Sequence, residues 1–594
     1  MVLLGILSLF QAWIIPGFLF LLFFRNIKII DSIVLSIPLS LILNYILIYT
    51  LVVFKFYNQT ILSIIISIEL VLIVYILIRN YGTSKLLSTV DIFFSLKDKN
   101  KLIKIEFSLI NLTVLLLFII YCFYALKNLG FPVQGGDPLD LWNEWALLWS
   151  KNQIPYNVEY PQAVPVLYSI SYVLISNYEI EYFTSAVCII YPIWIFVIFF
   201  RLIYLFPEKK ILIKFSLIIT TFFLFSILRN YALFIGYSDP ILVLTATSVC
   251  FIFVYYFFKN KSDINNNIYL KDIILISLIA STPAITKQMG LLISFAFPIF
   301  FLIIRYYQKR SFIKNFLIIS LIIFILSFSW YVFPIYEYLK INFDSSATHF
   351  GRLSSDAMGN YKDMSVIQKV NLGLDSLFWK FKYLILILLF LSLNNRYSLI
   401  ILFLIVLPYF FIWSLFFIAD NRNFLMVSPF LGFVLSVGLI NLINFFSFFN
   451  HKLVKKFKII LILTFTFLFA FFLQEIKHDK KLISKSIEDK KLRGFSEVNI
   501  LLYNYLKNTN PEHDIITISD RVFTYLPNIG DRFIRTGCSE FINLADNKYK
   551  NKEYYLLLNK DYCGLDDLYK NRLDTIKIIN LFDHKKHQFY FIAN

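Results

Sequence analysis

Long runs of apolar residues follow one another along most of this chain of 594 residues. Many of them exceed the roughly 18 residues that a helix needs to cross a membrane. Charged residues make up 16% of the sequence, whereas a soluble domain carries about 25%. The sequence therefore predicts an all-α polytopic membrane protein. We expect about fourteen transmembrane helices, near residues 2–24, 30–55, 60–78, 107–126, 182–205, 211–229, 240–258, 272–286, 289–305, 313–333, 378–393, 398–418, 424–446 and 458–475.

The net charge of +18 comes mainly from Lys and Arg in short loops between the apolar runs. This pattern orients a membrane protein and does not indicate a nucleic-acid partner. With the N-terminus outside, the basic loops all lie on the cytoplasmic side, provided that "AVPVLYSISYVLIS" (163–176) enters the membrane without crossing it. We therefore predict a multi-pass protein of the inner or plasma membrane. Its outward-facing loops are expected near 135–162, 236–239, 286–290, 334–377 and 419–423.

Three parts of the chain differ in composition. Residues 1–106 hold N-terminal transmembrane helices and a cytoplasmic loop, and 107–475 form the membrane core that carries the distinctive polar residues. Residues 476–594 begin with a charged linker and then alternate between helical and strand patterns. They predict a small extracytoplasmic α/β domain, with strands at "DIITIS", "EYYLLLN", "TIKIIN" and "HQFYFIAN".

Two cysteines of this C-terminal domain, Cys538 and Cys563, are predicted to form a disulfide, because a domain outside the membrane meets an oxidising environment. Cys122, Cys188 and Cys250 lie in predicted spans and should be free. Thiol labelling of the intact protein, with and without prior reduction, measures this directly. If a reagent confined to the cytosol labels both Cys538 and Cys563 without reduction, the domain lies on the cytoplasmic side of the membrane, and the predicted topology is inverted.

The densest polar and aromatic cluster is "GGDPLDLWNEWALLWSKNQIPYNVEYPQAVPVLYS", residues 135–169. Asp137, Asp140 and Glu144 stand among three tryptophans. If a helix starts at Pro138, Asp137 occupies its N-cap, so a purely structural role is one interpretation. The tryptophans have helical spacing, and tryptophans commonly gather at a membrane surface. As a group, these residues indicate an active site at the outer face.

Three further polar residues lie in the other outer loops. Asp239 in "GYSDP" precedes Pro240 at the start of a span, where it either caps the helix or belongs to the site. Lys287 in "TKQMG" lies between two short apolar runs with no acidic neighbour in sequence, and Arg422 in "DNRN" is a second outer cation. Two cations at headgroup level suit a phosphate, either of a substrate or of ordinary membrane lipids. No nucleotide-binding glycine motif is present.

The order of these motifs resembles that of the GT-C fold glycosyltransferases, which include protein mannosyltransferases and aminoarabinose transferases. The resemblance covers about 107–475. It implies that a first-loop carboxylate is the catalytic base, either Asp137 or Asp140, with the spacing to "WNEWA" favouring Asp137. It also implies that Lys287 and Arg422 hold a lipid phosphate, that Asp239 is the second-loop acid, and that a divalent cation is possible. Further substrate contacts are expected from Glu144, Trp142, Trp145 and Tyr160.

The activity implied by this resemblance is inverting transfer of a sugar from a polyprenyl-phosphate donor to a lipid-linked glycan, lipid or protein acceptor. A ligase or polymerase of lipid-linked glycans would use related chemistry on larger donors. A transporter or flippase would also be polytopic, but would more often carry charges in mid-membrane and paired repeats. We find few such charges and no repeat, which favours the transferase.

Overall fold

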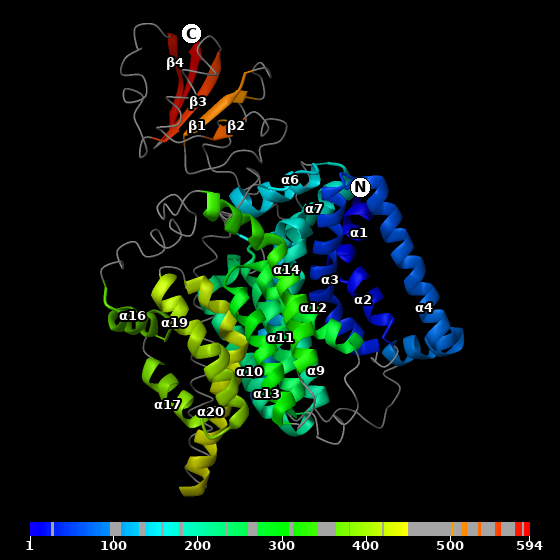
Figure 1. Cartoon of the computed structure of the whole chain (residues 1–594), viewed down its shortest axis with the longest axis vertical. Coiled ribbons are helices and arrows are strands. Elements are labelled where there is room, and N and C mark those ends of the chain that lie inside the picture. Colours follow the sequence, from blue (N-terminus) through cyan, green and yellow to red (C-terminus); the bar gives the residue numbers. More distant parts are fainter. Residues whose placement is uncertain are drawn as a thin grey trace.

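In a computed structural model, the chain is described at residues 1–24, 29–94, 109–129, 133, 138–155, 160–177, 182–232, 236–258, 270–307, 313–340, 364–378, 381–418, 421–449, 502, 505–506, 513–518, 533–535, 553–559, 577–584 and 587–593. Helices make up most of this part (Figure 1). They are α1 (Val2–Trp13), α2 (Ile15–Leu22), α3 (Ile29–Val53), α4 (Gln59–Phe94), α5 (Leu109–Asn128), η1 (Pro138–Asn143), α6 (Glu144–Ser150), α7 (Ala163–Ile175), α8 (Tyr182–Ala186), η2 (Val187–Ile189), α9 (Ile190–Leu205), η3 (Pro207–Lys209), α10 (Lys210–Ala232), α11 (Asp239–Phe258), α12 (Leu270–Thr286), α13 (Gly290–Tyr307), α14 (Ile313–Lys340), α16 (Val366–Phe378), α17 (Lys382–Ser392), α18 (Arg396–Ile401), η7 (Leu402–Val406), α19 (Leu407–Phe416), η8 (Asn421–Val427) and α20 (Ser428–Phe449).

The prediction of a polytopic helical membrane protein is confirmed, with fewer long spans than expected. Among the described residues, 8 helical segments are long and apolar enough to cross a membrane, or up to 9 if α1 and α2, which meet at a 49° bend, form one span. Pro16 at the start of α2 lies at this bend. Four of the remaining expected spans have shorter apolar helical stretches among the described residues, and 458–475 lies outside them. These stretches are Ile110–Leu126 within α5, Leu270–Thr286 (α12), Gly290–Ile303 within α13 and Lys382–Ser392 (α17).

Helix α7 has the short length that the sequence predicted. Its 13 residues (Ala163–Ile175) are all buried, and at 1.5 Å per residue they extend about 20 Å, less than the hydrocarbon core of about 30 Å. Pro165 lies in its first turn, where proline is tolerated, and the helix ends before Ser176, which adopts φ 53°. Helices α1, α3 and α6 pack around it, which explains why its apolar residues face every direction.

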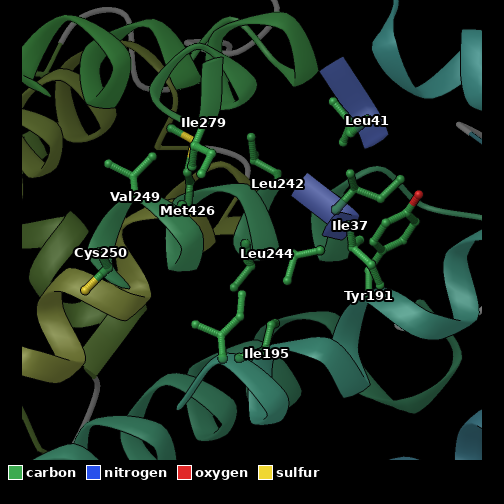
Figure 2. Close-up of a cluster of buried hydrophobic side chains, with 14 of the residues drawn as sticks. Ile37, Leu41, Tyr191, Ile195, Leu242, Leu244, Val249, Cys250, Ile279 and Met426 are labelled. Atoms are coloured by element: carbon green, nitrogen blue, oxygen red, sulfur yellow. The ribbon is translucent and has the colours of Figure 1, made fainter. Parts of the chain in front are cut away.

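The core of the membrane part is centred on α11. Of the candidate spans, α11 is the most buried, at 83% of its apolar window, and α4 the least, at 11%. Figure 2 shows Leu242 and Leu244 of α11 surrounded by side chains from other helices, among them Ile37 of α3, Ile195 of α9 and Ile279 of α12. The residue that starts α11, Asp239, therefore belongs to the most buried of the candidate spans. Helix α4 runs along the edge of the helical part (Figure 1).

The turn between α3 and α4 is fastened to α6 and α7. The Asn152 side chain accepts a hydrogen bond from the Tyr57 backbone N–H at 3.0 Å and donates one to the Tyr57 carbonyl at 2.9 Å. The Tyr57 hydroxyl lies 2.9 Å from Ser169 Oγ in α7, and Gln59 Nε2 donates to the Leu174 carbonyl at 2.8 Å. The N-terminal helices thus support the helices that follow the first polar cluster.

The C-terminal part contains a five-stranded sheet in the order β2-β1-β3-β5-β4. β1 (Ile515–Ile518) pairs parallel with β2 (Phe533–Arg535) and β3 (Tyr554–Asn559), while β5 (His587–Ala593) pairs antiparallel with β3 and with β4 (Lys577–His584). All four predicted strands are confirmed, and β2 is additional. Cys538 and Cys563 lie outside the described residues, so their disulfide remains a prediction, whereas Cys122, Cys188 and Cys250 are free, as expected.

Candidate functional site

The first outer loop leads into a helical segment that begins with a π-helical turn. This turn, η1, starts at Pro138, directly after Asp137, as the capping interpretation requires. Asp137 itself lies outside the described residues, and for Asp140 the structure describes the backbone within η1 only. Such π turns are rare and often occur at functional sites. Glu144 is the first residue of α6 and is half-buried.

The aromatic residues after this turn pack on one another. The ring centroids of Trp142 and Trp145 lie 5.3 Å apart, and those of Trp142 and Tyr160 lie 5.3 Å apart, both with edge-to-face geometry. Trp142 and Trp145 are 3% and 7% exposed. Tyr160 is half-buried. This packing favours an anchoring role for the two tryptophans, and leaves Tyr160 as the member of the group with the most surface for a substrate.

Buried polar contacts join α6 to α7. Asn143 is fully buried, and the Tyr172 hydroxyl donates to its Oδ1 at 2.5 Å. The Trp149 indole N–H donates to Gln162 Oε1 at 3.1 Å. Asn143 was not among the predicted site residues, although it stands inside "WNEWA". Its amide nitrogen has no hydrogen-bond partner among the described residues, which is unusual for a buried polar group.

Asp239 and Lys287 form a buried ion pair. Lys287 Nζ lies 3.1 Å from Asp239 Oδ1, and their side chains are 8% and 3% exposed. Lys287, which has no acidic neighbour in sequence, therefore has one in space, 48 residues away. It stands at the corner between α12 and α13, where the Gly290 N–H donates to the Lys287 carbonyl at 2.8 Å. A Cβ at residue 290 would lie 1.9 Å from the Pro283 carbonyl oxygen, so only glycine allows this corner.

Arg422 belongs to the same region of the protein. Its guanidinium carbon lies 5.5 Å from the ring centroid of Tyr237, two residues before Asp239, and its side chain is half-buried. Tyr409 of α19 donates to the Asn423 carbonyl at 2.5 Å and lies close enough to Asp239 for an electrostatic interaction. The predicted residues Asp239, Lys287 and Arg422 are thus brought together. Tyr237 and Tyr409 are additional, and no motif distinguishes Tyr409 from the other aromatic residues of its span.

Helix α7 connects this region to the first loop. The Tyr168 hydroxyl donates to the Gly236 carbonyl at 2.7 Å, in the loop that precedes Asp239. Gly236 has φ 109°, a conformation that other residues rarely adopt. The loops that carry "GYSDP", "TKQMG" and "DNRN" therefore converge beside α7, which packs against α6. Together, Lys287, Arg422 and Asp239 form a charged group of two cations and one carboxylate, in which Arg422 is partly accessible.

The described residues offer little support for the possible divalent cation. Among them, no group of three or more His, Cys, Asp or Glu side chains lies together, and Asp239 already has a cationic partner in Lys287. This statement does not include the side chains of Asp137 and Asp140, which the structure does not describe. We assign no step to a metal ion.

Comparison with known proteins finds similarity in structure only. No family model matches the chain, and no curated protein matches it. The structure is similar to that of ArnT from Cupriavidus metallidurans bound to undecaprenyl phosphate, with a TM-score of 0.48 and 9% sequence identity over 80% of this chain and 97% of that chain. The apo structure of the same ArnT gives a TM-score of 0.48 and 12% identity over the same shares.

Proposed function

We propose that the protein is an inverting glycosyltransferase that moves a sugar from a polyprenyl-phosphate donor to an acceptor hydroxyl at the outer face of the membrane. The observation that carries this proposal is the convergence of Asp239, Lys287 and Arg422. Polar groups gathered at one end of membrane helices are costly and usually functional. Two cations around one carboxylate leave a net positive site, which attracts a phosphate.

The chemistry requires one base and a stabilised leaving group. The donor releases a phosphate monoester, whose second pKa is about 6, so the departing oxygen needs little help from an acid. A carboxylate of the first outer loop, Asp137 or Asp140, takes the proton of the acceptor hydroxyl. The acceptor oxygen attacks the anomeric carbon as its bond to phosphate breaks, which inverts that carbon. Cations around the phosphate stabilise the charge that develops on it.

The two cations have different surroundings, which suggests different tasks. Lys287 is almost fully buried and is held by Asp239 at 3.1 Å. Arg422 is half-buried and lies against Tyr237. A guanidinium also offers paired N–H groups that match phosphate oxygens. We therefore assign the first contact with the donor phosphate to Arg422, and we assign to Lys287 a share of the phosphate charge together with the fixing of the corner between α12 and α13.

Arg422→Gln is expected to weaken donor use, because it removes a charge-assisted hydrogen bond worth about 1.5–3 kcal/mol. This corresponds to roughly a ten- to hundred-fold rise in the donor concentration that half-saturates the enzyme. Arg396 provides a matched control, since it is exposed and its guanidinium carbon lies 4.8 Å from the ring centroid of Tyr397. Arg396→Gln should leave donor use unchanged. An unchanged half-saturating concentration in Arg422→Gln would remove Arg422 from the site.

The activity itself is tested by mass spectrometry of cell-surface glycans and lipids from cells with and without the protein. A difference of one sugar mass on one acceptor supports the proposal and identifies the product. Purified protein in vesicles should then cleave a polyprenyl-monophosphate sugar and no nucleotide-sugar. A difference of a whole oligosaccharide would instead support the ligase or polymerase. A donor that crosses the vesicle membrane uncleaved would support the flippase.

A further inference from the structure

Helix α7 carries two fully buried tyrosines, Tyr168 and Tyr172, each of which binds a different loop of the candidate site. Side chains four residues apart lie on the same face of a helix, about 6 Å apart along its axis. The Tyr168 hydroxyl donates to the Gly236 carbonyl at 2.7 Å, in the loop before Asp239. The Tyr172 hydroxyl donates to Asn143 Oδ1 at 2.5 Å, in the segment that follows the first loop. One face of α7 therefore holds both of these loops.

Helix α7 is itself held by contacts that involve neither loop. Its Ser171 Oγ lies 2.5 Å from Thr184 Oγ1 of α8. Its Ser169 Oγ lies 2.9 Å from the hydroxyl of Tyr57, in the turn between α3 and α4. All 13 residues of the helix are buried. The position of α7 is therefore fixed by other parts of the helical bundle, and the two loops are attached to it.

The bond from Tyr168 leads to the proposed phosphate ligand, Arg422. Gly236 is followed by Tyr237, whose ring centroid lies 5.5 Å from the Arg422 guanidinium carbon. The Cys188 thiol contacts the Tyr168 hydroxyl and lies 3.8 Å from the Tyr237 carbonyl. Glycine adopts more backbone conformations than other residues. We therefore expect the bond from Tyr168 to restrict this segment and, with it, the ring against which Arg422 lies.

The bond from Tyr172 leads to the segment of the proposed base. Asn143 is the last residue of η1, the π-helical turn that starts directly after Asp137 and includes the backbone of Asp140. Its side chain is fully buried, and its amide nitrogen has no hydrogen-bond partner among the described residues. Within that part of the chain, the hydrogen bond from Tyr172 is what holds the Asn143 side chain, and through it the end of η1.

We propose that Tyr168 and Tyr172 are positioning residues: Tyr168 places the site of the donor phosphate, and Tyr172 places the segment that supplies the base. This inference rests on the proposed function. In a single displacement, the acceptor oxygen, the anomeric carbon and the departing phosphate oxygen must be aligned, so the base and the phosphate ligand must keep a fixed separation. The two loops are distant in sequence, and their bonds to one face of α7 provide that separation.

The experiment compares Tyr168→Phe with Tyr172→Phe, each of which removes a hydroxyl and keeps the ring. The measurements are the Kd of a polyprenyl phosphate and the transfer rate as a function of the concentration of the donor that the wild type uses. Tyr168→Phe should raise the Kd and the half-saturating donor concentration about three- to ten-fold, with little change in the rate at saturating donor. Tyr172→Phe should lower that rate about ten-fold or more and leave the Kd unchanged, since a small displacement of a reacting group strongly affects the rate.

Two further tyrosines provide matched controls. Tyr191 is fully buried, and its hydroxyl has no hydrogen-bond partner in the described part of the chain, so Tyr191→Phe should change neither measurement. Tyr57→Phe removes a bond to α7 that leads to neither loop. It should lower the melting temperature and leave the Kd and the saturating rate unchanged.

A double variant keeps the test available if Tyr172→Phe folds poorly. The single substitution leaves the Asn143 carbonyl oxygen buried without its donor, whereas Tyr172→Phe with Asn143→Leu removes both partners, which can be nearly neutral for stability. The double variant should fold as the wild type does, bind a polyprenyl phosphate with an unchanged Kd, and show the same loss of rate. A double variant with the full wild-type rate would overturn the role of Tyr172.

The two single variants would overturn the inference if they changed the Kd and the saturating rate by the same factors, if their effects were exchanged, or if neither changed either quantity. This outcome differs from failure of the proposed function. A wild type that binds no polyprenyl phosphate and transfers no sugar would overturn that function, and this inference with it. A wild type that does both, beside variants that do not separate the Kd from the rate, would overturn this inference alone.

Discussion

Asp137→Asn is expected to abolish turnover while the protein still folds and inserts. Asparagine keeps the shape of the side chain and is as good an N-cap as aspartate, so the start of η1 at Pro138 should survive. The substitution removes the negative charge and the proton acceptor. Loss of a general base costs about 10²–10⁴-fold in rate. The measurement is the initial rate of sugar transfer by purified protein at saturating donor, with the melting temperature recorded on the same samples.

Asp140→Asn, three residues further along the sequence, is the control for Asp137→Asn. Both substitutions remove one carboxylate from the same stretch of sequence, so a general effect of charge on the loop would lower both rates alike. We expect the Asp140 variant to keep much of its activity. An inactive Asp140→Asn beside an active Asp137→Asn would exchange the roles of the two residues. Two active variants would show that this loop does not supply the base, and the transferase proposal would lose its main chemical support.

Lys287→Met is expected to destabilise the folded protein by about 3–5 kcal/mol, because it leaves the Asp239 carboxylate buried without its partner. From the sequence alone, Lys287 had no acidic partner, and a substitution there would be expected to affect donor binding more than folding. Because Lys287 pairs with Asp239, we instead expect the substitution to affect folding more than donor binding. Thermal unfolding in detergent measures the effect. A variant as stable as the wild type would mean that the ion pair does not form.

The double substitution Lys287→Met with Asp239→Leu separates the structural role from the catalytic one. Replacing both members of a buried ion pair by apolar residues is often neutral or stabilising, so most of the lost stability should return. Transfer activity should stay low if Lys287 also neutralises the donor phosphate. Activity that returns together with stability would restrict Lys287 and Asp239 to holding the α12–α13 corner, and would leave Arg422 as the phosphate ligand.

Local patterns predicted the elements of this fold well. The strand-like alternation of "DIITIS" and "HQFYFIAN" identified β1 and β5, whereas β2 was missed because three residues, Phe533–Arg535, give no periodicity. The length of α7 followed from its short apolar run, beginning beside Pro165 and ending before a polar stretch. Among the described residues, fewer helices than expected are long and apolar enough to cross a membrane, because apolar composition alone does not separate such a helix from a shorter buried one such as Leu270–Thr286.

The candidate site was predictable as a set of loops but not as a set of contacts. The motifs named Asp239, Lys287 and Arg422, and the alternation of loops placed all three on one face. The pairing of Lys287 with Asp239 joins residues 48 apart on different helices, and no local rule specifies such a contact. Tyr409 illustrates the same limit, since its approach to Asn423 and Asp239 depends on how α19 packs against η8.

The contact between Asn152 and Tyr57 depends on the residue type at position 152 but not at position 57. On the N-terminal side it uses a backbone N–H and carbonyl, which every residue type except proline provides. On the other side it needs an amide of the right length at φ 58°, a conformation that asparagine accepts more readily than most residues. Glycine would accept the conformation without an amide, and glutamine is one methylene too long. A substitution of Tyr57 would therefore keep this contact and lose only the one between its hydroxyl and Ser169, whereas a substitution of Asn152 would remove the contact itself.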